Sequence, residues 1–281
     1  MVMLKIMLGI QKIKFGCHAI KTISILCLLL LVSCGDREPD ASISSQPPQQ
    51  ESAMSQSSEQ KAQTPIFITD YPRSYPLKLL KTGKFHGNEV QAKSGEQWLG
   101  LFSTAKGFEL LPTKIAVHTV RDYVLDTDET KKTGKEIILD EKYSPVFLVK
   151  GSIPLKPGIV KTVFLGNAKF SPNSPPLSVA LNHESRNTYQ ISVKERQNPE
   201  TIYHALLVYS GKDSIFQEIS SCCDDGSTAL LWAGDLDRDG KLDLLIDISN
   251  HYHVSLLTLF LSSTNQNKLL EPVAQFKTTG C

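Results

Sequence analysis

The sequence lacks the local signatures of the common catalytic sites. It has no G-x-S-x-G nucleophile elbow, no H-E-x-x-H zinc motif, no phosphate-binding loop and no G-x-G-x-x-G turn. Paired carboxylates for sugar hydrolysis stay open as an alternative, because two acids that meet in space need not be close in sequence. We therefore expect a protein that is not an enzyme.

A large charge of one sign is also missing. The chain has 30 Lys and Arg against 29 Asp and Glu. The first 34 residues hold four of the lysines and no acid, so residues 35–281 carry a formal charge of 26 − 29, or −3. This balance excludes a strongly basic nucleic-acid-binding protein.

Long apolar runs are absent too, but a short one lies near the N-terminus. Residues 23–32 follow a basic stretch, and ten residues match the core of a signal peptide better than a bilayer-spanning helix. The run ends in Leu31-Val32-Ser33-Cys34, which resembles the lipobox of bacterial lipoproteins. The resemblance implies a signal peptide over residues 1–33 and a mature chain that begins at a lipidated Cys34 bearing palmitate. A transmembrane anchor and a secretory signal without lipid are the alternatives.

The lipobox resemblance also implies a location in the bacterial cell envelope. Gly35, rather than an aspartate, follows Cys34, which favours the outer membrane. The face, periplasmic or surface, stays open. Residues 34–63 then form a predicted tether, since 13 of the 29 residues after Cys34 are Ser or Gln. As a flexible coil it spans roughly 30 Å.

The remainder of the chain is typical of an all-β protein. Short runs rich in β-branched and aromatic residues are bounded by Gly, Pro, Asn or Asp, and no window of a dozen residues keeps a helical period. These predicted strands are residues 114–120, 145–151, 159–165, 188–194 and 204–210. Short gaps between them favour antiparallel pairing. A turn-rich segment, 171–176, suggests a boundary between an N-terminal β region (64–175) and a C-terminal one (176–281).

The stretch from Asp235 to Asp243 has the pattern D-x-D-x-D-G-x-x-D, between apolar runs at 229–232 and 244–248. Four carboxylates in nine residues repel one another unless a hard cation lies between them. Gly240 permits the tight turn, and Ca²⁺ accepts six to eight oxygen ligands, backbone carbonyls included. The predicted calcium ligands are Asp235, Asp237, Asp239, the carbonyl of Lys241, and Asp243.

Other ions fit this loop less well. An EF-hand loop needs a glutamate at its twelfth position, where this chain has Ile246. Magnesium prefers near-octahedral sites with several waters, and zinc prefers His or Cys ligands, which the loop lacks. An acidic turn without any ion stays open.

Residues 232–247, followed by the apolar run 254–263, resemble an FG-GAP or VCBS-type repeat, the calcium-loop motif of integrin-like β-propeller blades. The resemblance implies a structural Ca²⁺ that clamps a hairpin and performs no chemistry. The motif occurs once, whereas a propeller needs several blades. We therefore expect one blade-like unit packed on a second β domain rather than a complete propeller.

Three cysteines, Cys222, Cys223 and Cys281, remain after the signal peptide and the lipidated residue. In an oxidising compartment they predict one structural disulfide that joins Cys281 to Cys222 or Cys223, and the choice stays open. Asp224 and Asp225 beside them form either an acidic surface turn or extra metal ligands.

A few aromatic residues and histidines are further candidates. Trp98 is expected in the core, although it could serve with Tyr203 and Tyr252 as a platform for a glycan. His251, His253 and Asp247 share one face of an extended strand, which allows a second metal site, but a polar junction is the commoner explanation.

These features predict a lipid-anchored envelope protein with a calcium-stabilised β domain and a structural or interaction role. Its partners are the membrane, through the lipid, and an envelope protein or a glycan. A glycan- or ligand-binding module and a calcium-dependent hydrolase are the two alternatives.

Overall fold

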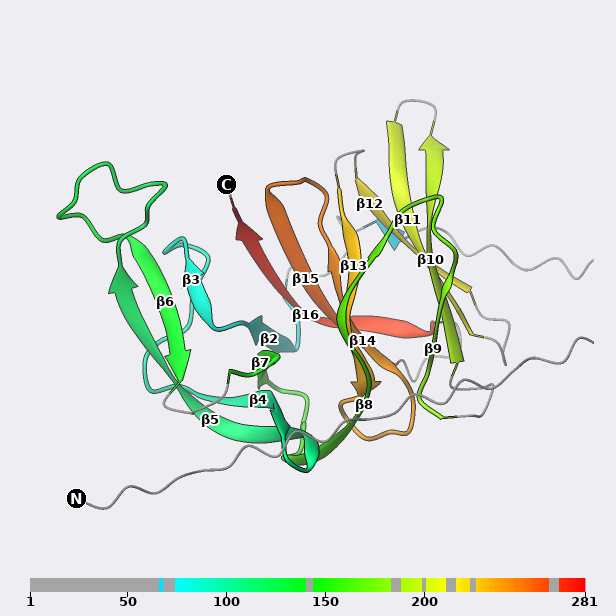
Figure 1. Ribbon diagram of the computed structural model, residues 1–281, viewed down its shortest axis with the longest axis horizontal. Helices are drawn as coiled ribbons and strands as arrows, with labels where there is room; N and C mark the ends of the chain where they lie inside the picture. Colours follow the sequence, from blue (N-terminus) through cyan, green and yellow to red (C-terminus); the bar gives the residue numbers. More distant parts are fainter. Residues whose placement is uncertain are drawn as a thin grey trace, which may run out of the picture. The chain divides into compact units, whose positions relative to one another are not determined.

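The computed structural model describes residues 66–67, 74–139, 144–182, 188–198, 201–210, 216–222, 226–262 and 268–280, all in one compact unit, Ser58–Cys281. These residues form strands and no helix, so none of them belongs to a helix able to cross a bilayer (Figure 1). The all-β prediction is confirmed. The strands are β1 (Ile66–Phe67), β2 (Leu77–Leu80), β3 (Gly83–Phe85), β4 (Gln97–Thr104), β5 (Gly107–Val120), β6 (Gly134–Leu139), β7 (Phe147–Gly151), β8 (Gly158–Phe170), β9 (Leu177–Ala180), β10 (Thr188–Asn198), β11 (Thr201–Ser210), β12 (Phe216–Cys222), β13 (Thr228–Asp235), β14 (Asp243–Ile248), β15 (Val254–Ser262) and β16 (Leu270–Thr279).

The strands form two sheets. The smaller has the order β1-β12-β11-β10-β9, and the larger follows the path β16-β15-β14-β13-β8-β5-β4-β7-β2, with β6 paired to β5 and β3 paired to β6. Every pair is antiparallel except β1 with β12. The end strands of the larger path, β16 and β2, contact each other, so this sheet nearly closes on itself.

The turn-rich segment 171–176 lies between β8 and β9, where the chain leaves the larger sheet for the smaller one. The chain returns to the larger sheet at β13, which pairs with β8. Strands from both sides of the segment therefore share the larger sheet. A division into separate domains at this point stays a prediction.

The four C-terminal strands form a meander in which each strand pairs with the next, the arrangement expected of a blade-like unit. Because β13 also pairs with β8, the meander continues into the larger sheet. It is buried on both faces. One hydrophobic cluster contains Trp232, Leu245 and Leu259, and a second contains Leu244 and Phe260. Burial on both faces explains why β14 and β15 are almost continuously apolar.

Trp98 belongs to the first cluster and is only 4% exposed, so its predicted core position is confirmed and its ring is not an open platform. Several other predictions lie outside the described residues. These are the signal peptide and tether with Cys34, Asp224 and Asp225, the side chains of Tyr203 and Cys222, and the whole of Cys223 and Cys281.

Candidate metal centre

The aspartate loop connects β13 to β14, and its two ends are fixed by the sheet and the core. Gly234 in β13 pairs with Asp243, the first residue of β14. Leu236 and Leu242, just inside the two ends, are fully buried, the first in one hydrophobic cluster and the second in the other. The loop is therefore held between both cores, and residues 237–241, between these two leucines, are exposed.

Gly234, in the Gly-Asp step of the motif, has a packing role. A Cβ at this position would lie 2.4 Å from the carbonyl oxygen of Lys161 in β8 and 2.5 Å from the Trp232 ring. Glycine thus permits β8 to approach closely, immediately before the first aspartate of the loop.

The loop turns through two residues with positive φ. Gly240 has φ of 80°, which glycine adopts without strain. Arg238 has φ of 66°, and its guanidinium Nη2 donates a hydrogen bond to the Lys156 carbonyl at 3.0 Å. The reversal this produces brings alternate aspartate side chains to the same side.

Three carboxylates converge in this turn. Oxygens of Asp235, Asp237 and Asp239 all lie within 4.8 Å of one another, close enough that they could hold a metal ion together. Asp237 and Asp239 are exposed, whereas Asp235 is partly buried. The Oδ2 atom of Asp235 accepts a hydrogen bond from the Gly240 N–H at 3.2 Å. Its Oδ1 atom is buried and has no hydrogen-bond partner. A buried acceptor without a donor is costly, and a cation would satisfy it.

Asp243 is the most deeply buried acid of the loop. Its Oδ2 accepts from the Leu236 N–H at 2.7 Å, and its Oδ1 accepts from the Ser262 N–H at 2.8 Å. It is not one of the three converging residues. Asp243 therefore ties both ends of the loop to the end of β15.

Lys241 and the Ser262 hydroxyl contact the carboxylate of Asp239. The Lys241 N–H donates to Asp239 Oδ1 at 2.8 Å, and its ammonium lies 3.5 Å from Asp239 Oδ2. The Ser262 hydroxyl donates to the same Oδ2 at 2.9 Å. These contacts orient Asp239. The predicted role of the Lys241 carbonyl as a ligand stays a prediction.

The electrostatics of the loop disfavour three ionised acids. Burial raises the pKa of Asp235, and repulsion from Asp239 adds to the increase. The pKa of Asp237 is raised by the same two causes, in the same order. Burial raises the pKa of Asp243 well above its usual range, with repulsion from Asp237 next. A divalent cation at the centre would offset these repulsions.

No family model matches the sequence, no curated protein matches it, and no solved structure matches its fold. The likeness to FG-GAP and VCBS-type repeats therefore depends on the residues of the loop and its flanking strands alone.

The second metal site, which the sequence allowed as the less common explanation for His251, His253 and Asp247, is not assembled. Asp247 accepts hydrogen bonds from the Ser255 hydroxyl at 2.8 Å and the Leu256 N–H at 2.9 Å. The rings of His251 and His253 are 5.4 Å apart and pack against Tyr252. Among the described residues, only the three loop aspartates form a group of acids, histidines or cysteines close enough to hold an ion.

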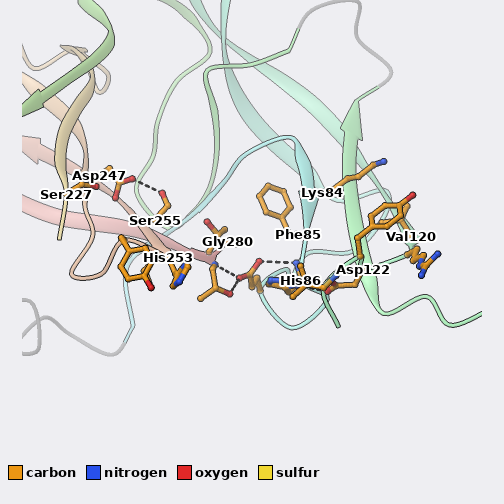
Figure 2. A pocket seen from close by; sticks show the side chains of 18 residues that line it. Lys84, Phe85, His86, Val120, Asp122, Ser227, Asp247, His253, Ser255 and Gly280 are labelled. Atoms are coloured by element: carbon orange, nitrogen blue, oxygen red, sulfur yellow. Dashed lines mark hydrogen bonds and ion pairs between the residues drawn. The ribbon is translucent and has the colours of Figure 1, made fainter. Parts of the chain in front are cut away.

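The sequence did not predict a second polar cluster, which lies in the cavity of Figure 2. His86 Nδ1 lies 2.6 Å from Asp122 Oδ2, and Glu89 accepts a hydrogen bond from the Thr279 hydroxyl at 2.7 Å. The hydrogen bond to Asp122 raises the pKa of His86, and the same bond lowers the pKa of Asp122. These partners are 36 and 190 residues apart, so no local pattern could have identified them.

Proposed function

We propose that this protein is a lipid-anchored component of the bacterial envelope, with a β13–β14 loop that binds a structural Ca²⁺. The observation that carries the calcium site is the convergence of Asp235, Asp237 and Asp239 around a buried oxygen that has no donor. Cys34 would carry the lipid. The role that follows is structural, or a scaffold for interactions, rather than catalytic.

The ligand chemistry favours calcium over other ions. All candidate side-chain ligands are carboxylates, which suit hard cations, and no histidine or cysteine lies in the loop. Two of the three carboxylates are exposed, which leaves room for water molecules in a flexible coordination sphere of six to eight oxygens. The Lys241 carbonyl and Asp243 are the further protein ligands that we propose.

Calcium in this position would stabilise more than the loop. Leu236 and Leu242 place the loop between the two hydrophobic clusters, and Asp243 connects it to β15. Drawing the aspartates together would therefore hold the β13–β14 hairpin against both cores. In a compartment where calcium is plentiful, a site as weak as about 10⁻⁴–10⁻³ M would be occupied.

Thermal unfolding of the full-length chain in detergent, with calcium or with a chelator, tests this proposal. At a calcium concentration of 100 times Kd, the folded state gains about 2.7 kcal/mol. For a domain of this size that gain raises Tm by roughly 5–10 °C. The variant Asp237→Asn should lose this increase.

Asp128→Asn is the matched control, because Asp128 is another exposed aspartate in a turn and is remote in sequence from the loop. It should keep the full calcium response. An equal response in Asp237→Asn and wild type, or no response in wild type, would overturn the calcium site.

A further inference from the structure

A groove distinct from the aspartate loop is the second candidate site. Its volume is about 610 Å³, and it lies between the residues after β3, the turn after β5, the β14–β15 connection and the end of β16 (Figure 2). None of the loop residues 235–243 lines it. It contains acids, bases and aromatic rings, and their hydrogen bonds decide which ligand it can accept.

Two of the acids in the groove, Glu89 and Asp122, already have donors on both oxygens. Glu89 Oε1 accepts from the N–H and the hydroxyl of Thr279, and Oε2 accepts from the His86 N–H at 3.0 Å. Asp122 Oδ2 meets the His86 ring, and Oδ1 accepts two backbone N–H groups of the turn at 3.1 Å. The carboxylate oxygens of both residues are therefore engaged by donors within the protein.

Asp247, at the opposite wall, is engaged in the same way by Ser255 and Leu256. The carboxylate oxygens of all three acids thus accept hydrogen bonds from groups within the protein. A cationic ligand would have to compete with these internal hydrogen bonds, so the acids do not make the groove a cation site.

Two bases of the groove, Arg121 and Lys84, have hydrogen-bond donors that the groove acids do not use. The Nε atom of Arg121 is buried and has no hydrogen-bond partner, and the guanidinium lies 5.3 Å from the centre of the Tyr123 ring. Lys84 is 60% exposed, and its ammonium is 4.0 Å from Glu136, at the limit of an ion pair. The Nη groups of a guanidinium can bind a carboxylate in a planar, two-point contact, so Arg121 is suited to an acidic ligand even though its Nε is buried.

Aromatic rings stand at both sides of the groove and face the solvent. Tyr123 is 78% exposed and Tyr252 is 68% exposed. Tyr252 is stacked on His251 with ring centres 4.4 Å apart, and Asp122 fixes the turn that carries Tyr123. Exposed rings that are held in place lose little conformational entropy when a ligand covers them.

We propose that this groove binds an acidic saccharide. The apolar ring faces of sugar units would stack on Tyr252 and Tyr123, and a sugar carboxylate would pair with Arg121 and Lys84. A platform for a glycan requires an exposed aromatic ring, and the ring of Tyr252 is exposed. This site is independent of the calcium proposal.

The shape and the charge of the protein favour a saccharide over other anions. The groove is partly open to solvent, whereas cofactors and small molecules are usually enclosed in pockets that bury most of their surface. The groove holds only two strong bases, Lys84 and Arg121, beside three acids, which suits a ligand with few carboxylates better than the dense charge of a nucleic acid. A sugar chain with one carboxylate per unit matches two bases and two exposed rings.

Calorimetric titration of the full-length chain with tetragalacturonate, and with neutral galactotetraose, tests the proposal. The acidic oligosaccharide should bind, and the neutral one should bind at least about tenfold more weakly, because it lacks the charge-assisted hydrogen bonds. Arg121→Gln and Tyr252→Ala should each weaken the binding of tetragalacturonate by about tenfold or more.

Lys169→Gln is the matched control, since it removes an exposed cation that does not line the groove, and it should leave the affinity unchanged. If Arg121→Gln fails to fold, Tyr252→Ala decides, because its ring is exposed and its loss should spare the fold. Three outcomes would overturn the proposal: no binding of tetragalacturonate, equal binding of the neutral oligosaccharide, or unchanged affinity in Tyr252→Ala.

Discussion

The aspartate loop and the groove both gather carboxylates, but they balance the charge in different ways. Around the groove, the hydrogen bond from His86 lowers the pKa of Asp122, and backbone donors add to the effect. In the loop, burial and mutual repulsion raise the pKa of Asp235 and Asp237, and one buried oxygen has no donor. The fold itself supplies hydrogen-bond donors to the acids around the groove. In the loop, Asp235, Asp237 and Asp239 instead form a group that could hold a metal ion.

The largest expected effect of a single change is at Asp243, whose two backbone hydrogen bonds give it a structural role besides the ligand role that we propose. Asp243→Ala leaves the buried N–H groups of Leu236 and Ser262 without acceptors. At about 1–3 kcal/mol for each unsatisfied group, the free energy of unfolding should fall by roughly 2–5 kcal/mol. Urea unfolding in the presence of a chelator measures this loss without the contribution of calcium. A loss under about 1 kcal/mol would contradict the structural role of this side chain.

The second-largest effect is expected at Asp235, where the substitution should change stability in opposite directions without and with calcium. Asp235→Asn removes one of the mutually repelling charges, so the variant should be more stable than wild type in chelator. In saturating calcium it should be less stable, because it lacks a ligand and forfeits part of the roughly 2.7 kcal/mol that binding supplies at 100 times Kd. Paired unfolding curves in the two conditions measure both differences. The same sign in both would show that Asp235 is only a structural residue.

A smaller loss is expected at Gly240, where the backbone has φ of 80°. No atom lies within 4 Å of the position that a Cβ would occupy, so Gly240→Ala tests the backbone conformation without a steric clash. The free energy of unfolding should fall by about 1 kcal/mol in chelator. Gly107→Ala, at φ of 110° and also without neighbours, is the comparison. It should cost a similar amount but leave the calcium response intact, whereas Gly240→Ala should weaken that response.

The smallest expected effect is the pH dependence of the His86–Asp122 pair. Because the pKa of His86 is raised above 6.5, its stabilisation is complete below about pH 6.5 and is lost as the pH rises through the folded-state value. Because the pKa of Asp122 is lowered below 3.8, its contribution is present above about pH 3.8 and is lost as the pH falls through the lowered value. The pair therefore stabilises the fold most between these limits.

His86→Gln should reduce the decrease in unfolding free energy that wild type shows as the pH rises above about 6.5. His118→Gln, which removes an exposed histidine, should leave that decrease unchanged. Chemical unfolding at a series of pH values compares the two variants. Equal pH profiles for His86→Gln and wild type would show that the pair does not contribute.

The strands that could be predicted were those with short runs rich in apolar or β-branched residues, such as β8, β11 and β15. β16 has no such run, since it contains Pro272 opposite Phe260, beside an irregularity in the pairing with β15. Proline is tolerated there because β16 is an end strand of the sheet path. Its position depends on the packing of the whole sheet, which a local pattern does not encode.

The same contrast explains which sites could be predicted. All the acids of the aspartate loop lie within nine consecutive residues, so their spacing alone indicates an ion site. The groove combines Arg121 and Tyr123, from the turn after β5, with Lys84 of β3 and Tyr252 of the β14–β15 connection, and only the folded chain places these segments around one cavity. Asp243 is intermediate: its position in the motif was evident, but its two backbone donors depend on the fold.

Direct calorimetric titration of Ca²⁺ into the chelator-treated full-length chain tests the central claim most directly. We expect one calcium ion to bind per chain, and we expect Asp237→Asn to abolish or strongly weaken the binding while Asp128→Asn leaves it unchanged. Absence of binding in wild type, or unchanged binding in Asp237→Asn, would contradict the proposal that the loop binds Ca²⁺.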